Sequence, residues 1–198
     1  MLPPRTRRHN TTRQEILDAA WAQAEESGVA GISLRELAAA VGMRAPSLYT
    51  YFESKDAIYD AMFTEAYEAL SRFSDEITAS VGDADRVDAL GIAVDRFIQF
   101  CQESPARYQL MFTRVVPGWE PSPDAYAVSV RSYEEMAVAL AGLGIVGQEA
   151  LDLYTAVSAG LAAQQMANDP TGDRWRRLAH SSMEMLVDHL DRQKGDDR

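Results

Sequence analysis

Hydrophobic residues recur every three to four positions along almost the whole chain, which is the spacing of α-helices with one buried face. The alternation of apolar and polar residues that marks β-strands is scarce, and so are the turn dipeptides of hairpins. The chain contains no repeat of fixed period and no low-complexity segment. This pattern predicts an all-α protein of about nine helices.

The ends of the predicted helices are set by capping and breaking residues. Ser33 and Glu36 have the spacing of a capping box, so one helix is expected to open there and to end at Val41. Ser54 is expected to cap a long helix that ends near Val81. The expected helices cover about residues 12–27, 33–41, 46–51, 54–81, 85–103, 105–116, 124–143, 147–168 and 171–192.

Two of the predicted helices are short and are joined by a tight turn. Gly42 permits the turn, because glycine adopts a positive φ without strain. Leu37 and Val41 are expected to pack inward, and Pro46 fits the first turn of the second helix. This is the layout of a helix-turn-helix, whose second helix enters the major groove of DNA.

Several short motifs follow one another over this segment. They are Ile32-Ser33-Leu34-Arg35-Glu36-Leu37-Ala38, Val41-Gly42, Ser47-Leu48-Tyr49, Tyr51-Phe52 and Ser54-Lys55-Asp56-Ala57-Ile58. In this order, and over Thr12 to about Ala61, the chain resembles the TetR family of bacterial transcriptional regulators. Beyond that stretch only the number and length of the helices resemble the family.

The resemblance implies which residues contact DNA. Tyr49 and Tyr51 offer hydroxyl groups to phosphate oxygens. Ser47 and Thr50 reach base edges or thymine methyl groups. Lys55 adds a charge to backbone N–H groups that face a phosphate. The full expected set is Arg35, Arg44, Ala45, Pro46, Ser47, Tyr49, Thr50, Tyr51 and Lys55, with Arg5, Arg7 and Arg8 of a basic N-terminal arm that enters the adjacent minor groove.

The chain departs from the family pattern just before the recognition helix. The family usually places Ser or Thr there, whereas this chain has Met43, Arg44 and Ala45. The missing cap costs about 1 kcal/mol of local helix stability, and Arg44 is expected to compensate by contacting phosphate or guanine. Taken singly, Tyr49 could pack on the first helix, and Arg35 could be an ordinary solvated arginine on the surface. The combined motifs favour DNA binding.

The resemblance implies a DNA-binding domain at residues 1–56 and a ligand-binding and dimerisation domain at residues 57–198. Small residues on the eighth helix permit close helix approach, so the last two helices are expected to form a two-fold dimer interface rather than ordinary core. The expected interface residues are Ala156, Ala159, Gly160, Ala163, Ala167, Trp175, Leu178, Ser182, Met185 and Leu186.

Aromatic and sulfur-containing residues gather in the fourth to seventh predicted helices and the loop after the sixth. Most are expected to be plain core, but a pocket with a few polar anchors would suit a small hydrophobic or aromatic effector. The expected pocket residues are Phe63, Tyr67, Phe97, Phe100, Tyr108, Met111, Phe112, Trp119, Tyr133 and Gln164. Further candidate anchors are Arg96, Gln99, Gln102, Arg107 and Gln165.

Charge is distributed unevenly along the chain. The 198 residues carry a formal net charge of −11, which argues against a nucleic-acid partner when it is taken as an average. Residues 1–52 contain six basic and five acidic residues and carry +1, whereas the remainder carries −12. The first fourteen residues hold four arginines before any acid. The distribution favours a DNA-binding front end attached to an acidic body.

No enzyme, cofactor or metal site is expected. The sequence lacks a glycine-rich phosphate loop, a nucleophile elbow and a paired-carboxylate motif. His180, Glu184 and Asp188 share a helix face that is expected to be solvated, and the single Cys101 excludes an intrachain disulfide. Without a signal-peptide pattern or a long apolar run, the chain is expected to be cytoplasmic.

The leading hypothesis is therefore a repressor that binds a palindromic DNA operator as a homodimer and is released by a small effector. Two alternatives remain open. One is a helix-turn-helix regulator without a small-molecule effector, and the other is an all-α ligand-binding protein with vestigial DNA binding.

Overall fold

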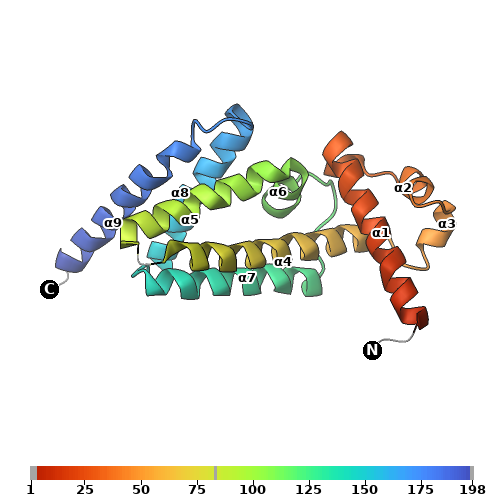
Figure 1. Ribbon diagram of the computed structural model, residues 1–198, viewed down its shortest axis with the longest axis horizontal. Coiled ribbons are helices and arrows are strands. Elements are labelled where there is room, and N and C mark those ends of the chain that lie inside the picture. Colours follow the sequence, from red (N-terminus) through yellow and green to blue (C-terminus); the bar gives the residue numbers. More distant parts are fainter. Residues whose placement is uncertain (1–3, 83, 197–198) are drawn as a thin grey trace. The chain divides into compact units, whose positions relative to one another are not determined.

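The computed structural model describes residues 4–82 and 84–196, except for the side chains of residues 4, 5, 79, 80 and 194–196 (Figure 1). These residues form nine α-helices and two short 3-10 helices without a strand, which confirms the all-α prediction. The α-helices are α1 (Pro4–Ser27), α2 (Leu34–Ala40), α3 (Ala45–Leu48), α4 (Lys55–Val81), α5 (Arg86–Glu103), α6 (Pro105–Phe112), α7 (Pro123–Gly142), α8 (Gln148–Asn168) and α9 (Ala179–Asp196).

The helices are divided between two compact units. The first unit comprises Met1–Tyr67 and Pro105–Ser129, and the second comprises Glu68–Ser104 and Val130–Arg198. Helices α4 and α7 each contribute to both units. The boundary expected after residue 56 divides DNA binding from ligand binding and dimerisation. It concerns function rather than packing, so it stays a prediction.

The first unit is built around one hydrophobic core. The buried stripe of α1 packs with α2 and with the start of α4, as the spacing of apolar residues predicts. Leu37 of α2 is fully buried, and Leu48 and Phe52 are 1% and 3% exposed. The short helices are therefore anchored by their inward residues, while their other faces remain in solvent.

The start of α2 is held differently from the prediction. Ser33 occupies the N-cap position, but its side chain makes no capping hydrogen bond. The backbone N–H of Ser33 donates instead to Oε1 of Gln23 at 2.6 Å, and Nε2 of Gln23 donates to Glu36 at 3.3 Å. The expected capping box is thus wrong, because a glutamine of α1 takes the place of Glu36 as the partner of Ser33.

Two other helix boundaries around the turn differ from the prediction. Helix α1 begins at Pro4 rather than near Thr12, so the expected arm is helical over its described residues. Helix α3 is a single turn that ends at Leu48, because Thr50 and Tyr51 donate to carbonyls three residues back. The predicted cap of α4 is confirmed, since Ser54 Oγ accepts from the N–H of Ala57 at 3.0 Å.

In the second unit, α5 packs against both α8 and α9 (Figure 1). Gly91 of α5 lies so close to α9 that a Cβ atom there would come within 3.1 Å of the His180 Cα. Polar pairs flank this contact, with Asp88 2.9 Å from His180 and Arg176 3.1 Å from Asp95. A small residue thus permits the close approach of α5 and α9, and polar pairs border it.

The predicted start of the last helix is wrong. It was expected to begin near residue 171, but α9 begins at Ala179 and is preceded by the 3-10 helix η2 (Arg176–Leu178). Helix α6 likewise ends at Phe112, four residues before the predicted end. The other helix ends lie within a few residues of the prediction.

The buried side chain of Gln165 explains the late start of α9. Its Nε2 donates to the carbonyls of Asp169 and Gly172, and its Oε1 accepts from the N–H groups of Trp175 and Arg176 at 2.9 and 3.1 Å. Four backbone groups of the loop are therefore bonded to one side chain of α8. A helix beginning at residue 171 would have to break these bonds.

Replacement of Gly42 by alanine is expected to destabilise the first unit. Gly42 has a φ of 69°, and a side chain at such a φ costs roughly 1–2 kcal/mol. Urea unfolding of Gly42→Ala should show a decrease of about that size in the free energy of unfolding. Gly142→Ala, at the exposed end of α7 with open space around the added Cβ, is the matched control and should not be destabilised. Equal stability of Gly42→Ala and the wild type would contradict the strained turn.

Candidate DNA-binding interface

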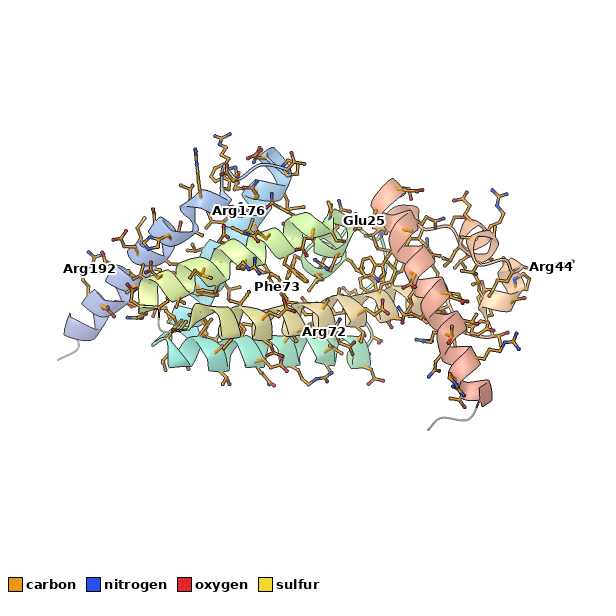
Figure 2. The ribbon with its side chains drawn as sticks, in the orientation of Figure 1. Glu25, Arg44, Arg72, Phe73, Arg176 and Arg192 are labelled. Carbon is orange, nitrogen blue, oxygen red and sulfur yellow. The ribbon has the colours of Figure 1, made fainter. Side chains whose placement is uncertain are left out.

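The recognition segment comprises α3 with its N-cap residue and the four residues that follow the helix, residues 44–52. The residues expected to read DNA lie on its solvent side. Arg44, Pro46, Ser47, Tyr49 and Thr50 are exposed. The side chain of Tyr49 is 56% exposed although it is aromatic and apolar over most of its area. Figure 2 shows Arg44 beside α3, on the side away from α1. The segment therefore offers hydroxyl groups and a guanidinium to a partner outside the protein.

The remaining members of this surface are partly buried. Ala45 and Tyr51 pack against the core of the first unit. Arg44 is the N-cap residue of α3 and makes no side-chain capping bond, in agreement with the missing cap that the sequence predicts. Its guanidinium is consequently not used to hold the helix.

Arg35 and Lys55 lie at the starts of α2 and α4. The Arg35 side chain is 88% exposed, and its 4.0 Å distance from Glu36 makes a weak surface pair at most. Lys55 is the first residue of α4, where backbone N–H groups lack partners within the helix. Its Nζ lies 5.3 Å from the centre of the Tyr59 ring. Both positions suit the binding of an anion such as a phosphate.

The basic arm takes a different form from the expected one. Arg7 and Arg8 are exposed residues of α1, and the side chain of Arg5 lies outside the described residues. An α-helix is about 10 Å across, whereas the minor groove is only about 6 Å wide. In this conformation the arm would meet phosphates along the groove edge rather than enter the groove.

Helix α4 is tied to α1 by a carboxylate that sequence reasoning missed. Oε1 of Glu65 accepts from Nε2 of Gln14 at 2.8 Å, and Oε2 accepts from Nε1 of Trp21 at 3.0 Å. The sequence contains no motif that signals this interaction, because the partners are more than forty residues apart. The helix that follows the recognition segment is thereby bonded to the helix that precedes it.

Six of the expected pocket residues come together in the first unit. Their rings form a chain of contacts, with Phe63 4.8 Å from Tyr67 and 5.9 Å from Trp119, and Tyr67 6.3 Å from Phe112. Tyr108 continues the chain of rings, with its ring centre 5.8 Å from that of Phe112. Met111 is buried, and its backbone carbonyl accepts a long hydrogen bond from the Tyr67 hydroxyl. Burial, assisted by nearby Tyr126, raises the pKa of Tyr67 to about 12.

The other four expected pocket residues belong to the second unit. Phe97 is half-buried, and Phe100 packs on Phe73 with ring centres 5.3 Å apart. Tyr133 is 38% exposed, and Gln164 is exposed and bonded to Asn168 of its own helix. The exposure of these two side chains gives no support to a role in an enclosed pocket.

The second unit contains an open hollow of about 750 Å³ at the C-terminal end of α5. Its lining includes two of the candidate polar anchors, Gln99 and Gln102, but none of the expected aromatic residues. Nε2 of Gln102 donates to the carbonyls of Pro170 and Gly172, so this amide supports the loop after α8. Gln165, a further candidate anchor, is bonded to the same loop, since its Oε1 accepts from the N–H groups of Trp175 and Arg176.

The expected dimer residues are mostly exposed on the second unit. The small residues of α8 chosen from the sequence, Ala156, Ala159, Gly160, Ala163 and Ala167, all face solvent. On and before α9, Met185 is 72% exposed and Leu178 39% exposed. Trp175 and Ser182 are half-buried, and Leu186 is only 6% exposed and belongs to the core.

Within the described ranges, no group of His, Cys, Asp and Glu side chains has an arrangement that could hold a metal ion. His180 is paired with Asp88 of α5 instead of facing a metal. Cys101 is buried and forms no disulfide. None of the helices in the described part of the chain is long and apolar enough to cross a membrane.

The helix-turn-helix segment matches a known family. The family model described as bacterial regulatory proteins of the tetR family matches residues 16–62. The HTH-type transcriptional regulator Rv1816 of Mycobacterium tuberculosis is 30% identical over 115 residues, which are 57% of this chain and 48% of that protein. The class D tetracycline repressor of Escherichia coli is 33% identical over 72 residues, which are 36% of this chain and 32% of that protein.

Similarity to solved structures extends over most of the chain. The crystal structure of the transcriptional regulator FadR from Bacillus subtilis, in complex with stearoyl-CoA, has a TM-score of 0.62 at 18% identity, with 88% of this chain and 97% of that chain covered. This likeness shows the fold alone. The chain spans about half the length of the first curated relatives that it matches. Residues 16–62 are therefore similar to the tetR family of bacterial regulatory proteins, and the two relatives named above are a transcriptional regulator and a repressor.

Proposed function

We propose that this protein is a transcriptional repressor that binds a palindromic DNA operator as a homodimer and is released by a small hydrophobic or aromatic effector. The observation that carries the proposal is the recognition segment, whose Leu48 and Phe52 are buried while Ser47, Tyr49 and Thr50 are exposed. The proposal assigns DNA binding to residues 1–56 and effector binding and dimerisation to residues 57–198. It includes the cytoplasmic location that access to chromosomal DNA requires.

Each exposed group has a proposed role on the duplex. Ser47 and Thr50 contact base edges or thymine methyl groups in the major groove, and Arg44 contacts phosphate or guanine. The hydroxyls of Tyr49 and Tyr51 donate to phosphate oxygens. Ala45 and Pro46 complete the surface of the recognition helix, and the remaining cations bind the phosphate backbone. Those cations are Arg35, Lys55, Arg5, Arg7 and Arg8.

The exposed face of α8 supports the proposed dimer. Small residues along one helix face let a second helix approach closely, as the alanines and Gly160 of α8 would allow. The exposed side chains of Met185 and Leu178 leave apolar surface in water in the monomer, and a two-fold contact would bury it. Two copies would then present two recognition helices to the half-sites of a palindrome.

The aromatic chain of the first unit supports an apolar effector. Phe63 and Tyr67 lie on α4, the same helix that begins at Lys55 next to the recognition segment. A ligand that displaced the Phe63, Tyr67 and Trp119 rings would move α4, and through Glu65 the movement would reach α1. That FadR of Bacillus subtilis holds stearoyl-CoA on a similar fold favours a ligand with a large apolar part.

Selection of duplexes from a random-sequence library with the purified full chain tests DNA binding directly. The proposal predicts enrichment of a palindromic sequence. Tyr49→Ala should bind the enriched duplex about tenfold more weakly, because it removes one hydrogen bond to a phosphate. Tyr126→Ala is the matched control, since Tyr126 is 57% exposed, like Tyr49, but lies on α7. Failure to enrich any duplex at moderate salt would refute the proposal and favour an all-α ligand-binding protein.

A charge placed on the exposed face of α8 is expected to separate the dimer. Ala163→Glu would bring two carboxylates into an apolar contact, where neither is solvated or paired. Sedimentation equilibrium should find this variant monomeric at concentrations at which the wild type is a dimer. Ala139→Glu, which adds the same charge to an exposed alanine of α7, should remain dimeric. A dimeric Ala163→Glu would place the interface elsewhere.

A thermal-shift screen of apolar and aromatic compounds separates an effector-controlled repressor from a regulator without an effector. A specific ligand stabilises the folded state increasingly as its concentration exceeds the Kd, so it should raise the Tm and also release the enriched duplex. Compounds that raise the Tm without releasing the duplex would contradict control by that ligand.

A further inference from the structure

The recognition helix α3 is too short to hold its own direction. It comprises Ala45–Leu48, a single turn, and single turns are unstable in isolation because nucleation fixes several backbone dihedrals for one hydrogen bond. The N–H of Thr50 donates to Ser47, and those of Tyr51 and Phe52 donate to Leu48. The carbonyl groups that follow Leu48 therefore need partners from elsewhere.

Arg13 of α1 supplies one of these partners. Its Nη1 donates to the backbone carbonyl of Tyr51 at 2.8 Å. The same guanidinium lies over the ring of Phe52, 4.0 Å from the ring centre. A planar, charged group that donates to one residue and stacks on the next fixes both the position and the tilt of the chain at the end of the recognition segment.

His9 supplies a second contact, one helical turn before Arg13. Its ring lies 4.9 Å from the ring of Tyr51, and its Nε2 lies 3.5 Å from the carbonyl oxygen of Thr50. In the tautomer that carries the proton on Nε2, the histidine donates to this carbonyl. Residues four apart lie on the same face of a helix, so one face of α1 contacts three successive residues of the recognition segment.

We propose that Arg13 and His9 are positioning residues, which orient Tyr49, Thr50 and Tyr51 toward DNA without contacting DNA themselves. The inference rests on the proposed DNA-binding function. It assigns to the front of α1 a task besides carrying charge, namely to cap the end of the recognition segment. Binding to a specific sequence then depends strongly on Arg13. Electrostatic attraction to any duplex depends on Arg13 less, because that attraction requires charge but no defined side-chain direction.

The test uses the full chain, the duplex enriched by selection and a random-sequence duplex of the same length. Arg13→Gln should bind the enriched duplex about tenfold more weakly and the random duplex within about twofold of the wild type. The slope of log K against log salt should stay unchanged, because Arg13 itself neutralises no phosphate. His9→Ala should act in the same direction, and Asn10→Ala, on the exposed side of the same helical turn, should bind like the wild type.

Hydrogen exchange of the free protein provides a readout that does not need an operator. Backbone amides of residues 49–52 should exchange faster in Arg13→Gln than in the wild type, while those of residues 57–67 should not change. If Arg13→Gln fails to fold, Arg13→Lys, which keeps the charge but removes the planar stack on Phe52, decides the question by the same measurements.

Two results would overturn the inference. An equal decrease in affinity for both duplexes, with a salt slope lower by about 0.9, would show that Arg13 binds a phosphate directly. Unchanged affinity together with unchanged exchange would show that Arg13 and His9 do not position the segment. If no duplex is enriched at all, the proposed function fails, and the exchange measurement alone still shows whether Arg13 orders residues 49–52.

Discussion

The recognition segment depends on being anchored in a core that it does not itself contain. A helix of four residues has almost no internal hydrogen bonds, so its direction comes from the burial of Leu48 and Phe52 among residues of α1 and α4. Burying two large apolar side chains contributes roughly 3–6 kcal/mol, far more than a single helical turn could supply. The solvent exposure of Ser47, Tyr49 and Thr50 follows from this anchoring, since Leu48 and Phe52 are four residues apart and both face inward, which turns these neighbours toward solvent.

Helix α4 connects that anchored segment to the remainder of the first unit. It starts three residues after Phe52, and two of its carboxylates bind different neighbours. Glu65 accepts hydrogen bonds from Gln14 and Trp21 of α1, whereas Asp60 accepts from the Trp119 indole at 3.2 Å and from the N–H of Ser122 at 3.1 Å. A displacement of the loop that carries Trp119 would thus act on the same helix that is bonded to α1. This arrangement gives a physical route by which an apolar ligand could change the presentation of the recognition segment.

The sequence predicts the helices, the turn at Gly42 and the burial of Leu37, because these depend on local periodicity and backbone conformation. It does not predict Gln23 as the partner of Ser33, Gln165 as the anchor of the loop before α9, or Arg13 as the partner of Tyr51. These bonds join side chains to backbone groups as many as 38 residues away, and no local pattern specifies them. The helical form of the arm was missed for a related reason, since exposed polar residues carry no apolar stripe. The sequence likewise groups aromatic residues that the structure divides between two units.

The net charge of −11 is compatible with DNA binding because the charge is divided. The acidic body repels a duplex, whereas Arg35, Arg44, Lys55, Arg7 and Arg8 offer exposed or partly exposed cations in the first unit. The most direct test is the salt dependence of binding to the enriched duplex, compared between the full chain and residues 9–198. Log K should fall linearly with log salt for the full chain, and truncation should flatten the slope by about 0.9 for each phosphate that the arm neutralises. Equal slopes for the two chains, or an affinity independent of salt, would contradict binding through this local cationic surface.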